Sequence, residues 1–176
     1  MKNLIVLTLA LMFPVFAGTA HSADLTDAQI AHIVVTANTV DIEAGNLAKN
    51  KASHKDVQGY AHRMIEDHTD VNKQATDLAT KLKVTPQDNA ISKDLRADGK
   101  KNLDKLNGLM KGSEFDKAYI DGEVKLHKQL IEVVDKKLVP DAKNEDLKAL
   151  LIKVRPTLVS HLEHAKQLQT SLADKR

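Results

Sequence analysis

The fold class is decided by the stretch Ser53–Leu82, which reads SHKDVQGYAHRMIEDHTDVNKQATDLATKL. Apolar residues and one histidine recur in it at alternating steps of four and three, at Val57, Ala61, Met64, His68, Val71, Ala75, Leu78 and Leu82. This spacing places them on one face of an α-helix, as in the packed seam of a helix bundle. The stretch therefore predicts a helix over about 54–83 that buries this face.

The same spacing continues on both sides of this stretch. It predicts three more long helices at about 26–50, 114–138 and 145–173, and a shorter helix at about 87–110. Residues typical of helix starts precede the five segments, namely Thr26, Ser53, Thr85, Ser113 and Asn144. Pro156 is expected to kink the last helix or divide it in two.

The lengths of the connections predict the topology. Helices joined by only a few residues are expected to be antiparallel, which pairs the first two long helices and the last two. The shorter helix is long enough to carry the chain back along the whole bundle. We therefore expect an all-α four-helix bundle with an extra crossover helix between the second and third long helices, which is a ferritin-like arrangement. In the alternative, the shorter helix caps a simple up-and-down bundle.

Composition excludes several classes of function. The chain has 176 residues, of which 42% are hydrophobic, and this fits one domain with an aliphatic core. Cysteine is absent, which excludes disulfides, thiolate metal sites and cysteine nucleophiles. The 26 basic and 24 acidic residues nearly balance, so the bulk charge does not favour binding to nucleic acid.

The first 23 residues resemble a secretory signal peptide. Lys2 precedes an apolar run at Leu4–Ala17, and small residues follow it. The run is shorter than the roughly 20 residues that a membrane-spanning helix needs. We expect cleavage near Ala20 to Ala23 and a periplasmic or secreted protein. Residues 24–176 would then form a helical domain without a membrane span.

The candidate site consists of histidines on the apolar seams. His68, His127 and His161 each lie near the middle of a different predicted long helix, and the remaining long helix carries Asp41 and Glu43 at a similar depth. Neutral imidazole is the commonest metal ligand in proteins, and bundle interiors can assemble ligands from facing helices. These five residues therefore predict a metal site that could hold Zn, Cu, Ni or Fe.

Two neighbours complete the candidate ligand set. Glu123 lies four residues before His127, and His164 lies three residues after His161. Asp67 is expected to point elsewhere on its helix, whereas three further acidic residues are expected to orient the imidazoles from behind, namely Glu66, Asp121 and Glu163. In the alternative interpretation, the buried polar layer binds no ion and only fixes the register of the helices.

Four segments resemble the DUF4142 family of exported bacterial proteins, whose members are often labelled outer membrane proteins and are thought to be ferritin-like. The segments occur in the expected order over nearly the whole chain after the signal, and they are Asp41–Ala48, Ala61–His68, Phe115–Tyr119 and Pro156–Leu162. The resemblance implies that the recurrent polar positions of the family include Asp67, His68, His127 and His161. It implies no established activity.

These observations favour a periplasmic bundle that binds one transition-metal ion through a central layer of histidines and carboxylates. The alternative is a non-enzymatic envelope stress or interaction protein whose histidine layer is structural. A metal-dependent oxidoreductase on the same scaffold is a third hypothesis. Di-iron ferritins use Glu-x-x-His motifs, and the sequence contains none, so a carboxylate-rich di-iron site is not expected.

Overall fold

The computed structural model describes residues 24–173, and every regular element in this range is a helix. Five helices are long, at α1 (Asp27–Lys51), α2 (Lys55–Lys81), α3 (Ala90–Gly108), α4 (Ser113–Val133) and α6 (Glu145–Ala173). The predicted all-α class is therefore confirmed, and the five segments expected from the sequence are all present. The expected signal peptide, residues 1–23, lies outside the described residues.

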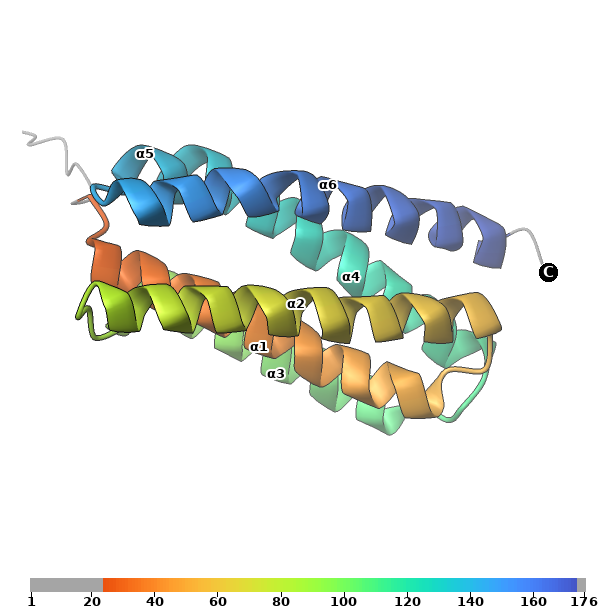
Figure 1. The fold of residues 1–176 in the computed structure, drawn as a ribbon. Coiled ribbons are helices and arrows are strands. Elements are labelled where there is room, and N and C mark those ends of the chain that lie inside the picture. The colour runs from red at the N-terminus through yellow and green to blue at the C-terminus, as the bar shows by residue number, and fades with distance from the viewer. Residues whose placement is uncertain (1–23, 174–176) are drawn as a thin grey trace, which may run out of the picture.

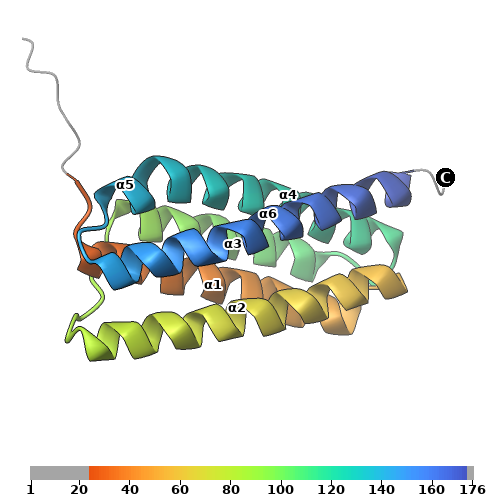
Figure 2. The same ribbon diagram turned by 45° about the horizontal axis from the view of Figure 1, so that its top comes forward.

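Four long helices, α1, α2, α4 and α6, form the bundle, and α3 lies along its outside against α1 and α4 (Figures 1 and 2). The helix α3 runs the length of the bundle, so α2 and α4 point in the same direction. Gly99 permits the close approach of α3 to α1, because a Cβ atom at this position would lie 2.6 Å from Cγ1 of Val40.

The helix starts agree only in part with the sequence analysis. Thr26 caps α1 in a capping box with Gln29, and Asn144 accepts a hydrogen bond from the N–H of Leu147 at the start of α6. The other three expected caps are wrong. The residues found at these positions are His54 for α2, Asn89 for α3 and Gly112 for α4.

Ser53 does not cap α2, because its backbone N–H and its hydroxyl both donate to a distant carboxylate. Asp116 on α4 accepts hydrogen bonds from the backbone N–H groups of Ser53 and His54, at 2.8 and 2.9 Å, and from the Ser53 hydroxyl. Asp116 is only 1% exposed. These bonds tie the α1–α2 connection to the first turn of α4 and satisfy donors that precede α2.

The two prolines have different effects on their helices. Pro140 follows a π-helical turn, η1 (Val134–Leu138), which joins α4 to the short α5 (Val139–Asp141). A proline ring collides with the carbonyl of the preceding turn in a regular α-helix, and the wider π turn changes that register. Pro156 lies inside α6 and does not divide it.

The core has two apolar halves. One half, which we call the aromatic cluster, contains Tyr60, Phe115 and Tyr119 among small and aliphatic residues. The other, the aliphatic cluster, contains residues such as Ile33, Leu130 and Leu151. Between them lies a layer of buried polar side chains at Asp41, His68, Glu123, His127 and His161. Among the helices of residues 24–173, none is both long and apolar enough to cross a membrane.

Candidate metal centre

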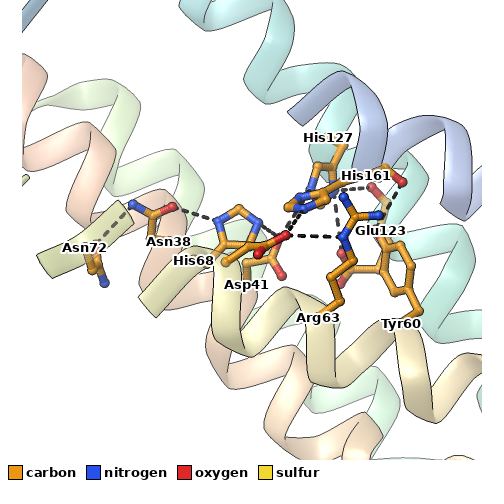
Figure 3. Close-up of polar contacts among 10 residues, drawn as sticks. Asn38, Asp41, Tyr60, Arg63, His68, Asn72, Glu123, His127 and His161 are labelled. Atoms are coloured by element: carbon orange, nitrogen blue, oxygen red, sulfur yellow. Dashed lines mark hydrogen bonds and ion pairs between the residues drawn. The ribbon is translucent and has the colours of Figure 1, made fainter. Parts of the chain in front are cut away.

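Each of the four bundle helices contributes to the polar layer. Asp41 comes from α1, His68 from α2, Glu123 and His127 from α4, and His161 from α6. All five side chains belong to residues that are at most 2% exposed. Figure 3 shows the three imidazoles facing one another, and their ring centroids lie 5.3 to 5.6 Å apart. The three histidines that the sequence placed on separate seams therefore meet at one point.

The outer nitrogen of each ring is held by an acceptor. The backbone carbonyl of Glu123 accepts from Nδ1 of His127 at 3.1 Å, and a carboxylate oxygen of Asp67 accepts from Nε2 of His161 at 2.7 Å. The amide oxygen of Asn38 accepts from Nδ1 of His68 at 2.7 Å. A carbonyl and a carboxylate cannot donate, so these contacts assign the ring protons to the outer nitrogens.

The inner nitrogens are consequently lone pairs when the rings are neutral, because a neutral imidazole carries one N–H. Nε2 of His127 and Nδ1 of His161 lie 3.3 Å apart, and neither has a proton to share with the other. Nε2 of His68 completes the set of nitrogens within 4.8 Å of one another. Three lone pairs that converge in this way form the donor arrangement of a metal site.

Asp41 adds a carboxylate to the same point. Its Oδ2 lies 3.2 Å from Nε2 of His68 and 3.7 Å from Nε2 of His127. Within residues 24–173, neither carboxylate oxygen of Asp41 has a hydrogen-bond partner, and Nε2 of His68 likewise has none. Buried polar atoms are almost always hydrogen-bonded in native proteins, so these atoms without partners are available to a cation.

The spacing of the donor atoms fits a small ion. Tetrahedral ligands at zinc-like bond lengths of 2.0–2.1 Å are separated by about 3.3 Å. The three distances between inner atoms given above are 3.2, 3.3 and 3.7 Å. Three of the separations among the four donors are therefore close to those around a first-row transition ion.

The electrostatics also favour binding of a cation. Burial lowers the pKa of His68, His127 and His161 to about 4, so all three rings are neutral and able to ligate at pH 7. Burial raises the pKa of Asp41 to about 6, although the nearby His127 opposes this shift. Burial, followed by the charge of Asp41, raises the pKa of Glu123 well above its usual range.

Glu123 lies beside the other edge of His127. Its Oε2 is 3.5 Å from Nδ1 of His127, on the side of the ring that faces away from His161. Asp41, Glu123 and His127 also form a second group whose donor atoms lie within 4.8 Å of one another. The polar layer therefore contains a histidine-rich group and a carboxylate-rich group that share His127.

Two of the seven residues expected to bind the metal lie outside the layer. Glu43 is an exposed residue of α1, because it is two positions from Asp41 and so points away from the bundle axis. His164 is half-buried one turn beyond His161, and its ring packs against Tyr60 with the centroids 5.3 Å apart. The structure places neither residue in the cluster of donors.

The residues that were expected to orient the imidazoles do not contact them. Glu66 and Glu163 are exposed, and Asp121 accepts a hydrogen bond from Gln169. Asp67, which was expected to point elsewhere, instead accepts a hydrogen bond from His161 on the neighbouring helix. Asp67 also accepts from Nε of Arg63 at 3.2 Å.

Asn38 was missed by the sequence analysis, although a signal was present. It lies three residues before Asp41 and therefore on the same face of α1. The amide nitrogen of Asn38 donates to Oδ1 of Asn72 at 3.1 Å, which orients the amide oxygen toward His68. A polar residue on a predicted buried face one turn from a candidate ligand is a candidate to support it.

Comparison with known proteins gives a family and no activity. The family model described as "Domain of unknown function (DUF4142)" matches residues 14–168. The curated proteins and the solved structures contain no significant match to the chain. The match spans most of the sequence and includes every residue of the polar layer, although it ends at residue 168 within α6. The chain therefore belongs to the DUF4142 family.

Proposed function

We propose that this protein binds one transition-metal ion through His68, His127, His161 and Asp41. The observation that carries the proposal is the assignment of the ring protons. Three acceptors hold the outer nitrogens, so three lone pairs and one carboxylate oxygen are directed to a common point. Glu123 accepts from His127 through its backbone carbonyl and so orients this ligand.

The chemistry of the donors narrows the choice of ion. Three imidazole nitrogens and one carboxylate oxygen suit Zn, Cu, Ni or Fe better than Mg or Ca, which prefer oxygen ligands. Three of the donor separations are close to those of tetrahedral zinc, so we propose zinc as the first ion to test. The site is completed by protein groups alone, which is typical of a tightly held ion rather than of a catalytic zinc with an open position.

The wider setting is part of the same proposal. We infer that residues 1–23 direct export and that the metal site forms in the periplasm or outside the cell. A ferritin-like arrangement is part of this proposal, and it is supported by the long crossover helix between two antiparallel pairs and by ligands that come from facing helices. The site itself is richer in nitrogen than the carboxylate sites of di-iron bundles.

Metal titration of the tag-free protein that begins at Asp24 tests the proposal. Isothermal titration with Zn²⁺ should give one ion per chain, and elemental analysis after dialysis should retain it. His127→Ala should abolish tight uptake while circular dichroism shows that the helices persist. The exposed His62 provides the matched control, because His62→Ala should bind zinc like the parent protein.

A structural histidine layer is the alternative, and the same experiment separates the two functions. The layer divides the aromatic cluster from the aliphatic cluster, so it could fix helix register without any ion. Absence of stoichiometric uptake for Zn²⁺, Cu²⁺, Ni²⁺ and Fe²⁺ would overturn the metal proposal. The structural role would then be supported if His127→Ala also lost cooperative unfolding.

A further inference from the structure

An apolar cavity of about 50 Å³ lies beside the polar layer, on the side of the aliphatic cluster. The bundle helices and the π turn η1 line it. Most of its lining is aliphatic, including Ile33, Val34, Ala37, Leu130, Val134 and Leu158. At one end, the cavity is bounded by His68 and His161, two of the proposed metal ligands.

The volume of the cavity sets the size of a ligand. One water molecule occupies about 30 Å³ in the liquid, and apolar cavities of about 150 Å³ accept benzene. A cavity of about 50 Å³ therefore fits one molecule of two or three heavy atoms. An amino acid, a sugar or an aromatic ring is too large.

The lining sets the polarity of the ligand. At the histidine end, the outer ring nitrogens already have partners, since Asn38 accepts from His68 and Asp67 accepts from His161. A water molecule needs two to four polar partners, and an ion needs a compensating charge. The aliphatic walls offer neither, so the cavity favours a small uncharged molecule.

The cavity also has a short route to the surface. Val71 on α2 and both Val154 and Thr157 on α6 line it and are partly exposed. These three residues form a rim between α2 and α6. The opposite wall includes Val134 and Leu138 of η1, and π turns inside α-helices are frequent at functional sites.

We propose that this cavity binds one small uncharged molecule of the size of dioxygen and places it directly beside His68 and His161. The binding site is formed by the protein alone and requires no metal. If the metal is also bound as proposed above, the cavity gives such a molecule an approach to the ion from the side of these two imidazoles.

Xenon is the probe for the first test, because it is uncharged and of suitable size. Metal-free protein with ¹³C-labelled methyl groups is titrated with dissolved xenon and followed by NMR. We expect saturable shifts at methyl groups of Val34, Ala37, Val134 and Leu158 and at the ring signals of His68 and His161. Methyl groups of the aromatic cluster should not show saturable shifts. Paramagnetic relaxation under dioxygen pressure should enhance the same methyl groups.

Two matched substitutions on α6 locate the binding site. Val154→Phe places a ring at the rim and should remove the saturable xenon shifts. Val159→Phe is the control, because Val159 is a partly exposed valine of the same helix that does not line the cavity. Its xenon response should match that of the parent protein. If Val154→Phe does not fold, Val71→Phe fills the rim from the facing helix.

Unsaturable or uniformly distributed xenon shifts would overturn the proposal, as would an unchanged response in a folded Val154→Phe protein. Failure of the metal proposal is a separate outcome. A protein that takes up xenon beside His68 but binds no zinc would refute the metal site and leave the cavity intact. A protein that binds zinc but shows no saturable xenon site would refute the cavity proposal and leave the metal site intact.

Discussion

Asp116 and Asp41 are both buried aspartates, yet their surroundings differ completely. Asp116, at the α1–α2 connection, accepts three hydrogen bonds from Ser53 and His54. Asp41, in the polar layer, is 0% exposed, and no hydrogen bond reaches its carboxylate from the part of the chain that the structure describes. A buried carboxylate with satisfied oxygens stabilises the fold, whereas one with open oxygens can bind an ion.

The largest effect on stability is expected at the satisfied carboxylate. Asp116→Ala removes the acceptor of three hydrogen bonds, which come from two partly buried backbone N–H groups and a hydroxyl. The loss of these three bonds should lower the free energy of unfolding by about 3 kcal/mol. Urea unfolding followed by circular dichroism measures this loss. Zinc affinity of the folded protein should not change. If the free energy of unfolding equalled that of the parent protein, the hydrogen bonds to Asp116 would not stabilise the fold.

Loss of Asp67 is expected to weaken zinc binding, because Asp67 holds His161 in its ligating tautomer. Asp67→Ala should weaken zinc binding by about 10- to 100-fold, as the loss of an outer partner of a histidine ligand usually does. Competition with a chromophoric chelator measures the affinity. Asp70→Ala, on the exposed side of the same helix, is the control and should have no effect. Equal affinity in both variants would contradict the proposed orientation of His161.

The pH dependence of stability tests the polar layer in the absence of metal. Between about pH 6 and 4.5, the unfolded chain protonates three histidines that stay neutral in the folded protein, where their pKa is about 4. The folded protein in turn holds protons on Asp41 and Glu123, whose pKa values are raised. The balance leaves one extra proton on the unfolded chain.

Stability should therefore fall on acidification through this range by on the order of 1 kcal/mol per pH unit. Urea unfolding at pH 6, 5.5 and 5 in the presence of a chelator measures the slope. His127→Gln removes one of the three histidines and should flatten it. A stability that rises as the pH falls would mean that the carboxylates outweigh the imidazoles.

A gain in stability, rather than a loss, is expected when the carboxylate of Asp41 is replaced by an amide. Asp41→Asn removes a buried charge and supplies an N–H that can donate to one of the inner imidazole nitrogens. It should raise the stability of the metal-free protein by about 1 kcal/mol and remove tight zinc binding. Asp116→Asn, the matched change, should lower stability. Thermal unfolding of both variants with and without zinc separates the two roles.

The smallest effect is expected at the exposed acidic neighbour of Asp41. Glu43→Gln should change stability by less than about 0.5 kcal/mol and leave zinc affinity unchanged, because Glu43 points to the solvent. Calorimetric titration measures the affinity. A weakened zinc complex would show that Glu43 contributes to the site in spite of its exposure.

The helices and the three central histidines could be predicted because both depend on the period of the α-helix. Alternating steps of four and three residues identify the buried face of each helix, and His68, His127 and His161 lie on it. The same argument selects Asp41 over Glu43, since the side chain two positions away turns to another face. The sequence analysis nevertheless retained both residues, because the apolar residues of the first helix, such as Val34, Val35 and Ile42, are spread over several faces.

Contacts between helices could not be predicted in the same way. Asp67 on α2 accepts a hydrogen bond from His161 on α6, and Asp116 on α4 accepts one from Ser53, the expected cap of α2. Both contacts depend on how far one helix slides along another, which helical periodicity does not specify. The cavity is harder still, because it results from the shapes of many side chains and from the π turn before Pro140.

The order of the ligands along the chain has a consequence for when the centre can form. Asp41 is on the first helix and His161 is on the last, so a chain that lacks either helix also lacks one of the four donors. A chain whose last helix has not yet been made would hold an ion only weakly. Metal acquisition would then report that the final helix has docked, and the ion would be loaded in the compartment where folding ends.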